Sequence, residues 1–285
     1  MAMNEGMHSI KHSRIVAKAI VYILIIALAI VFFYPFLWMI FTSLKTTKEI
    51  YQVPATMFPH HITFDNYMAA VTKMPFLRYT LNTVVITILS VIGMVVSSSM
   101  VAYSVSKINW KGSKIIFPII IGTMMIPYQV TMIPLYMIYT KLNLVGTFVP
   151  LVLPCFFGGA YYIFLLRQFF KTIPNSLLEA AKIDGAGEGT IFVKIMLPLC
   201  KPALTSVAIF TFLATWSDFL GPLLYLNKEE SYTLSLGLQA FMQTHYVEWG
   251  PLMAASAIFT VPIVILFFFA QSYFIEGITV TGMKA

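Results

Sequence analysis

Six long apolar runs constrain the fold of this chain more than any other feature of its sequence. The first, residues 19–41, contains no charged side chain, and about 20 apolar residues in a helix are enough to cross the hydrocarbon core of a bilayer. Because this run is longer than the apolar core of a signal peptide, we expect it to be retained as a span. The sequence predicts an all-α integral membrane protein with six transmembrane helices. The other five predicted spans are residues 81–106, 115–133, 147–166, 202–226 and 251–275.

Composition agrees with a membrane protein. Hydrophobic residues make up 59% of the chain and charged residues only 10%, whereas an average soluble domain is roughly a quarter charged. The net charge of +7 comes from basic residues spread through short segments between apolar runs. This distribution is typical of charges that set membrane topology, so we expect no nucleic-acid partner.

Six spans place both termini on the same side of the membrane. Of the 18 Lys and Arg residues, 12 lie in segments on the side of the N-terminus and 6 on the other side. Since cytoplasmic loops carry an excess of Lys and Arg, both termini are predicted to be cytoplasmic. The predicted organisation is a cytoplasmic segment 1–18, a six-span domain 19–275 with a cytoplasmic loop 167–201 and external loops 42–80, 134–146 and 227–250, and a cytoplasmic tail 276–285. A short surface helix is expected at residues 64–72.

The loop 167–201 is a polar island in an apolar chain. It carries eight charged residues, too many to bury in lipid. Ser176 and Glu179 have the spacing of a capping box, which predicts a helix start, and Gly185 is placed to end that helix in the left-handed conformation. A second helix is expected at residues 190–197. The apolar residues of the first helix fit either an interface with a partner or a connector packed under the bundle.

Asp218 is the only acidic residue within a predicted span, where a charge costs about 2.5 to 3.5 kcal/mol on insertion scales. It should therefore face the bundle interior, water or a partner. Trp216, Ser217 and Tyr225 are close to it in sequence. A carboxylate beside an aromatic ring could contact a sugar in a substrate path, but the same group could instead hold a kinked helix through a structural polar contact.

Other chemistries have little support in the sequence. There is no Gly-x-x-x-x-Gly-Lys-Ser/Thr phosphate loop, no His-Glu-x-x-His helix and no Gly-x-Ser-x-Gly elbow. We therefore expect a non-catalytic chain that binds no cofactor itself. His60, His61 and His245 lack a third ligand at zinc-like spacing, so no metal site is expected. Cys155 and Cys200 fall at opposite predicted faces and should not form a disulfide.

The island also carries a family resemblance. Glu179-Ala180-Ala181, Gly185, Ile195 and Leu197-Pro198 match every defined position of the EAA loop in membrane subunits of bacterial ATP-binding-cassette (ABC) importers. The flanking residues resemble the carbohydrate-uptake branch, and most of all the smaller permease of the maltose type. These flanking segments are residues 166–170, 183–186, 198–204, 216–219 and 277–284. Ser217 departs from the pattern, because many relatives have Asn there.

The resemblance implies the fold of a type I ABC importer permease and a coupling role for residues 176–184. This coupling helix would dock in a cleft of a cytoplasmic ATPase, with Glu179 as its polar anchor and Gly185 as its pivot, and Lys284 in the tail would also touch the ATPase. The residues expected at or near this contact are Glu179, Ala180, Ala181, Asp184, Gly185, Glu188, Ile195, Leu197 and Pro198.

The resemblance also implies a set of partners in the bacterial cytoplasmic membrane. These are two ABC ATPase subunits that hold ATP and Mg²⁺, a second, homologous permease and an extracytoplasmic sugar-binding protein. The substrate would be a carbohydrate, with an oligosaccharide favoured. A charged or phosphorylated polyol stays open as an alternative, and an ion-coupled secondary transporter is a more distant one.

The predicted topology can be tested directly. A cysteine placed at position 188 should be protected from a membrane-impermeant thiol reagent in intact cells, because the polar island is expected in the cytoplasm. The measurement is labelling of intact and of permeabilised cells. Labelling from outside in intact cells would contradict the proposed orientation.

Overall fold

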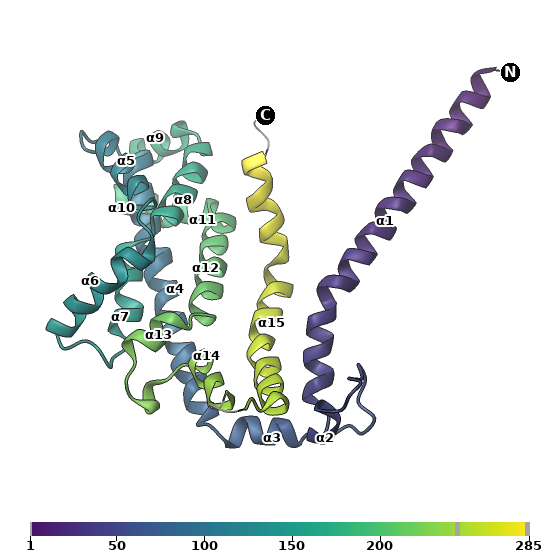
Figure 1. Ribbon diagram of the computed structural model, residues 1–285. Helices are drawn as coiled ribbons and strands as arrows, with labels where there is room; N and C mark the ends of the chain where they lie inside the picture. Colours follow the sequence, from purple (N-terminus) through teal and green to yellow (C-terminus); the bar gives the residue numbers. More distant parts are fainter. Residues whose placement is uncertain (1, 243–245, 283–285) are drawn as a thin grey trace. The chain divides into compact units, whose positions relative to one another are not determined.

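Every regular element in the described part of the chain is a helix. The computed structural model describes residues 2–242 and 246–282, with side chains described for residues 17–242 and 246–271 (Figure 1). Within these ranges the only β-contact is an isolated bridge between Met242 and Val247. The predicted all-α class is confirmed.

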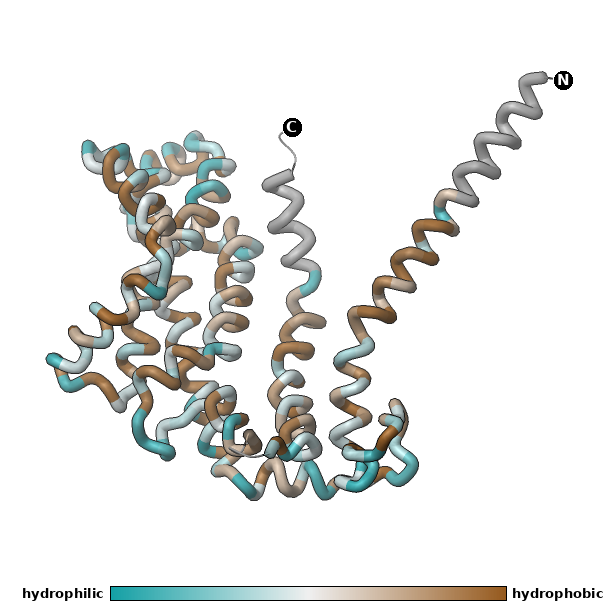
Figure 2. Tube along the Cα trace, viewed as in Figure 1, coloured by the Kyte–Doolittle hydropathy of each residue, from teal (hydrophilic) through white to brown (hydrophobic). Residues whose placement is uncertain are grey.

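Four helical segments of the described chain are long and apolar enough to cross a membrane, and six if each of two bent helix pairs counts as one span. Three of the four are α1 (Ala2–Ser43), α4 (Phe76–Lys107) and α15 (Trp249–Gly282). The fourth joins α7 (Val149–Val152), the 3₁₀ helix η1 (Leu153–Phe157) and α8 (Ala160–Thr172). Figure 2 shows the apolar residues along these helices.

The first bent pair is α5 (Ser113–Thr123) with α6 (Tyr128–Lys141), which meet at 98°. We expected one kinked span at residues 115–133 and a loop from residue 134. Instead the helix stops before Pro127, since a residue that precedes proline is disfavoured in the helical conformation. Helix α6 then continues through Pro134 to Lys141, so residues 134–141 are helical.

The second bent pair leads out of the polar island. The segment Glu188–Leu199 and α12 (Lys201–Trp216) meet at 79°. The predicted span 202–226 is not one helix, because α12 ends at Trp216 and a separate short helix, α13 (Leu220–Tyr225), follows. Residues 217–219 form the break between the two helices.

The span formed by α7, η1 and α8 is also interrupted. Gly158 has a φ of +80°, in a region that side chains with a Cβ rarely adopt. Two serines of α4 bind the interrupted backbone. Ser97 Oγ donates to the Cys155 carbonyl (2.9 Å), and Ser98 Oγ accepts from the Gly159 amide (3.2 Å). These small residues of α4 thus face protein.

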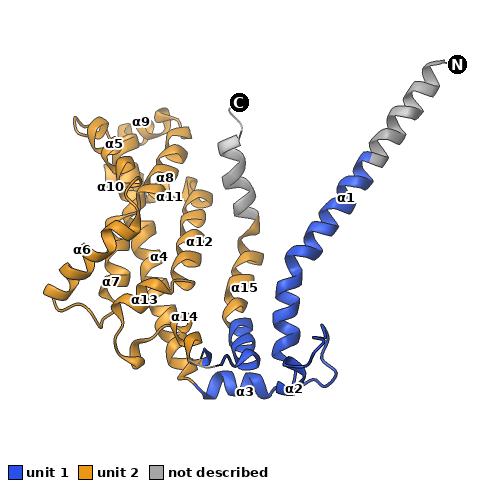
Figure 3. Cartoon of the chain, in the orientation of Figure 1, with its two compact units in different colours: residues 1–73, 241–258 blue, residues 74–240, 259–285 orange. Residues whose placement is uncertain are grey.

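Contacts divide the chain into two compact units (Figure 3). Unit 1 consists of Met1–Lys73 and Phe241–Ile258. It includes α2 (Thr47–Ile50) and α3 (Asp65–Thr72), and α3 confirms the short helix predicted at residues 64–72. The buried Asn66 side chain fixes α3, because its Nδ2 donates to the carbonyls of Ser43 (3.0 Å) and Lys45 (2.7 Å).

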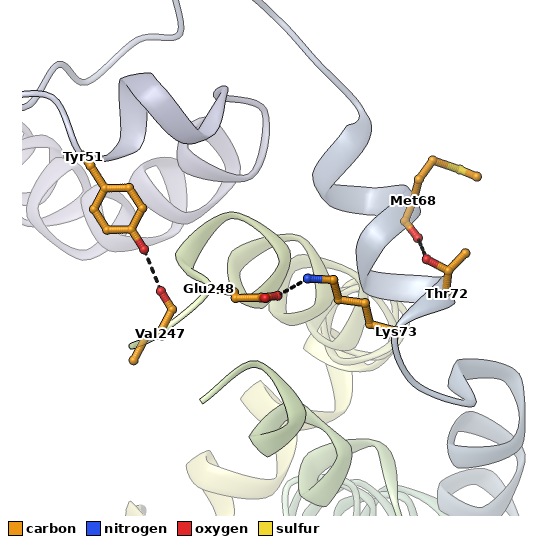
Figure 4. A network of polar contacts seen from close by, with 6 residues as sticks. All are labelled: Tyr51, Met68, Thr72, Lys73, Val247 and Glu248. Carbon is orange, nitrogen blue, oxygen red and sulfur yellow. Dashed lines mark hydrogen bonds and ion pairs between the residues drawn. The ribbon is translucent and has the colours of Figure 1, made fainter. Parts of the chain in front are cut away.

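Polar contacts connect the two sequence segments of unit 1 (Figure 4). Lys73 Nζ pairs with Glu248 Oε2 at 2.5 Å, and the Tyr51 hydroxyl donates to the Val247 carbonyl at 2.7 Å. Because the Lys73 side chain is 49% exposed, this ion pair contributes little on its own. It fixes the direction in which the chain enters α15.

Unit 2 consists of Met74–Ala240 and Phe259–Ala285 and contains the main core. The core brings α4, α8 and α12 together with the polar island. Leu166, Phe170, Ile191, Met196 and Val207 have no exposed surface. The island is therefore anchored in the bundle by its own apolar side chains.

Candidate functional site

The first helix of the island is α9 (Asn175–Ile183). The predicted capping box is wrong: no side chain caps α9, and the helix begins one residue before Ser176 with Pro174 at the N-cap. A lysine from another helix binds the oxygens at this end. Lys107 Nζ, from the last turn of α4, donates to the Ile173 carbonyl at 2.6 Å and to Asn175 Oδ1 at 2.8 Å.

Helix α9 ends as the glycine predicts. Gly185 has a φ of +84°, and its amide donates to the Lys182 carbonyl (3.0 Å). The Ala186 amide donates to the Ala181 carbonyl (2.9 Å), which completes a Schellman motif. No atom lies within 4 Å of the place where a Gly185 side chain would begin. Glycine is thus needed here for its backbone conformation and not for space.

Helix α9 has a buried face and an exposed face. Leu178 is 6% exposed and belongs to the core, and Ala181 packs against that core. On the other face, Ile183 is 86% exposed. A large apolar side chain beside charged groups on a fixed helix is typical of a protein interface. The exposed face of α9 comprises Leu177, Glu179, Ala180, Ile183 and Asp184.

The second half of the island is helical, as predicted for residues 190–197, but its helix contains a π-helical turn. It consists of α10 (Glu188–Ile191), one π-helical turn (Phe192–Met196) and α11 (Leu197–Leu199). Ile195 packs against the core and Leu197 is partly buried, whereas Pro198 is exposed. These residues hold the island on the bundle, while the exposed face of α9 is left available for a partner.

Glu188 points toward the bundle. One carboxylate oxygen accepts a hydrogen bond from the Tyr103 hydroxyl at 2.6 Å, and the other pairs with Lys182 Nζ at 2.6 Å. These hydrogen bonds, first that of Lys182 and then that of Tyr103, lower the pKa of Glu188 below its usual value. The carboxylate therefore links α9, α10 and α4.

Asp218 lies in the break between α12 and α13. Its Oδ1 accepts the Gly221 amide in the first turn of α13 at 3.1 Å, and its backbone carbonyl accepts from Ser235 Oγ at 2.5 Å. The carboxylate thus stabilises the interrupted backbone. Its structural role, which the sequence left open, is present in the structure.

A cavity of about 360 Å³ opens beside Asp218, within the usual range of roughly 300 to 1,000 Å³ for small-molecule sites. Helices α4, α6, α12 and α13 all contribute to its wall. The lining residues with polar side chains are Asp218, Thr83, Tyr128, Thr215, Tyr225 and Thr233.

Of the four residues predicted for the substrate path, Asp218 and Tyr225 line this cavity, and Trp216 and Ser217 do not. Trp216 is 3% exposed. Its ring stacks on Phe212 with the centroids 5.4 Å apart, and its Nε1 donates to the Phe259 carbonyl at 3.1 Å. Trp216 therefore packs the bundle. Ser217 forms the exposed C-cap of α12.

Sequence reasoning missed Tyr128, Thr83 and Thr233. Tyr128 looked like part of a lipid-facing span, and only its position directly after Pro127 marked a change of direction. Thr83 lines the cavity from α4, at the point where this helix passes beneath the predicted external loop 227–250. The amide of Leu234 in that loop donates to Thr83 Oγ1 at 2.8 Å.

The external loop 227–250 is only partly a free surface. Its helix α14 (Leu234–Gly237) is buried in unit 2 and contacts α4. Exposed charges remain on Lys228, Glu229 and Glu230.

The described residues contain no group of three metal-binding side chains. The backbone amides of His60 and His61 donate to Glu49 Oε1 at 2.9 and 3.2 Å. Burial raises the pKa of Glu49, but hydrogen bonds from Thr46, His60 and His61 lower it by more. The pKa of Glu49 therefore lies below its usual value. Cys155 and Cys200 are free. His245 and Lys284 lie outside the described residues.

The chain combines apolar spans with a polar island fixed to one end of them and a polar cavity among broken helices. Together these features define a membrane transport subunit. Residues 94–280 match the family model described as "Binding-protein-dependent transport system inner membrane component". The chain belongs to this family. It is a multi-pass component of the plasma membrane, and subunits of this family are permeases without catalytic activity of their own.

Relatives and a solved structure agree with this assignment. The arabinooligosaccharides transport system permease protein of Halalkalibacterium halodurans is 35% identical, over 90% of this chain and 93% of the relative. A diacetylchitobiose uptake system permease protein of Streptomyces coelicolor is 30% identical, over 87% and 83%. A chain of a bacterial ABC transporter for alginate import has a TM-score of 0.81 at 24% identity, covering 91% of this chain and 96% of that one. This last likeness shows the shared fold.

Proposed function

We propose that this chain is a permease subunit of an ATP-driven, binding-protein-dependent carbohydrate importer, and that α9 is its coupling helix. The observation that carries the proposal is the exposed face of α9, where Ile183 is 86% exposed on a helix whose other side is buried in the core. The chain contains no phosphate loop. Energy must therefore come from a partner, and α9 is the surface suited to receive it.

The proposed assembly has two cytoplasmic ATPase subunits that hold ATP and Mg²⁺, a second, homologous permease and an external sugar-binding protein. Counting α5 with α6 as one span and α12 as another makes six spans, with both termini and the polar island, including α9, in the cytoplasm. The distribution of Lys and Arg supports this orientation. Exposed Lys228, Glu229 and Glu230 belong to the surface that would meet the binding protein, and Lys284 in the tail would reach the ATPases.

Within the coupling loop, the motif residues take two different roles. Glu179, Ala180 and Asp184 are exposed on α9 and would contact the ATPase, with Gly185 setting the direction in which α9 ends. Ala181, Ile195 and Leu197 are partly buried and would keep the loop on the bundle when the ATPases close. Movement of α9 would then reorient the spans between inward-facing and outward-facing states.

The cavity beside Asp218 is the proposed substrate contact in this subunit. Its carboxylate can accept hydrogen bonds from sugar hydroxyls, and Tyr128 and Tyr225 supply aromatic surface and hydroxyl groups. No Lys, Arg or His is among the described residues that line it. This favours a neutral, hydroxyl-rich substrate over a phosphorylated polyol. The names of the relatives, which transport arabinooligosaccharides and diacetylchitobiose, support an oligosaccharide.

Gly185→Ala should uncouple the importer. Alanine at a φ of +84° costs roughly 1–2 kcal/mol, which corresponds to a factor of about 5–30 in the population of the correct helix end. Sugar uptake and binding-protein-stimulated ATP hydrolysis of the reconstituted complex should fall by a similar factor. Gly187→Ala is the matched control, because Gly187 has a φ of −74° and open space around it. Equal activity of both variants and the wild type would exclude the proposed role of α9.

Asp218→Asn separates a substrate contact from a structural one. Asparagine can still accept the Gly221 amide, so the break between α12 and α13 should persist, but the charge that would bind sugar hydroxyls is lost. Since a hydrogen bond to a charged group is worth about 1.5–3 kcal/mol, the KM for uptake should rise about tenfold or more. Asp218→Ala, which loses both functions, should in addition impair assembly. Wild-type uptake by Asp218→Asn would assign the carboxylate a purely structural role.

A further inference from the structure

The cytoplasmic end of α4 holds both ends of α9. At the start of α9, Lys107 Nζ donates to the Ile173 carbonyl (2.6 Å) and to Asn175 Oδ1 (2.8 Å). Lys107 is the last residue of α4. The entry into α9 is thus fixed by a helix that is far from it in sequence.

The end of α9 is held one helical turn further back along α4. The Tyr103 hydroxyl donates to Glu188 at 2.6 Å, and the same carboxylate pairs with Lys182 in the last turn of α9 at 2.6 Å. Tyr103 is 4% exposed, and its ring contacts Phe170 and Phe192 with centroid distances of 6.4 and 5.2 Å. The donor is therefore rigidly placed. Because Tyr103 and Lys107 are four residues apart, they share one face of α4.

These contacts differ in strength. The Lys182 and Glu188 side chains are 49% and 43% exposed, and exposed ion pairs contribute little. The bond from Tyr103 to Glu188 is short, charge-assisted and made by a buried residue, which places it among the stronger hydrogen bonds. Tyr103 and Lys107 are thus the principal ties: Lys107 binds the entry to α9 directly, and Tyr103 holds Glu188, the first residue of α10, three residues after the Gly185 turn that ends α9.

The other end of α4 reaches the cavity. Thr83 and Ile86 line it, and Thr83 lies 20 residues before Tyr103, about 30 Å along a helix with a rise of 1.5 Å per residue. Helix α4 contains no proline and is continuous from Phe76 to Lys107. The other spans of unit 2 that line the cavity are each interrupted along their length. A displacement applied at Tyr103 and Lys107 can therefore travel along one rigid element.

We propose that α4 transmits the movement of α9 to the cavity, and that Tyr103, Lys107 and Glu188 are positioning residues that fix α9 to α4. This inference rests on the coupling role of α9 proposed above. The competing route is the covalent one, in which α9 moves only the helices that precede and follow the island, α8 and α12.

The test uses the full complex of permeases, ATPases and binding protein, reconstituted in proteoliposomes. Tyr103→Phe with Lys107→Met removes both ties and keeps the packing of the aromatic ring. We expect the sugar transported per ATP hydrolysed to fall at least fivefold, with the partner subunits still copurifying. Lys111→Met, a lysine of the same basic turn, is the matched control. Glu188→Gln, which can still accept from Tyr103, should keep most of the coupling, whereas Glu188→Ala should lose it.

Spin labels at two exposed positions, 183 on α9 and 220 beside the cavity, separate the two routes. In the double variant, a non-hydrolysable ATP analogue should still change the spectrum at position 183, whereas the change at position 220 should be lost. A full response at both positions, with a normal ratio of sugar to ATP, would overturn the role of α4. If the wild-type complex transports no sugar on ATP addition, the proposed function itself fails, and the inference about α4 fails with it.

Discussion

A bilayer offers no hydrogen-bond partner to a peptide group, and this constraint explains where the cavity lies. Every break in a spanning helix must be repaired by protein or lie against a water-accessible space. Serines of α4 repair the break at Gly158, and Asp218 and Ser235 repair the one at residues 217–219. The break at residues 217–219 and the one before Tyr128 lie next to the cavity beside Asp218. The cavity thus forms where two spans stop being regular.

Helix α4, in contrast to these interrupted spans, is unbroken. Its small residues allow close approach of the interrupted span: a Cβ added at Gly93 would lie less than 3 Å from the Phe156 ring. Its long polar side chains, Tyr103 and Lys107, lie where α4 leaves the apolar region and meets the island. The small residues in the middle of α4 support the irregular backbone of the interrupted span, and the long donors at its end support the helix that faces the proposed ATPase.

The parts of the fold that depend on local chemistry were predictable from sequence. The apolar runs identified the spanning segments, and Gly185 predicted the end of α9 because a left-handed residue is required within the helix terminus itself. The capping box failed because α9 begins at Asn175, which places Ser176 inside the first turn and not at the N-cap. The positions of the breaks in the third and fifth predicted spans were not readable from the sequence, because a break is tolerated in the membrane only when distant side chains repair it.

At the site, too, the sequence indicated what depends on a residue itself but not which distant residues it contacts. Asp218 was recognisable because a charge in an apolar run is costly, but its charge alone did not reveal which neighbours it has. Tyr225 lines the cavity with it, whereas Trp216, closer in sequence, turns toward Phe212 and Phe259. A helix reverses the direction of its side chains within two residues, and the break at Ser217 changes that direction again. Proximity in sequence therefore says little about a shared surface at a helix end, and the contacts across helices decide which residues meet.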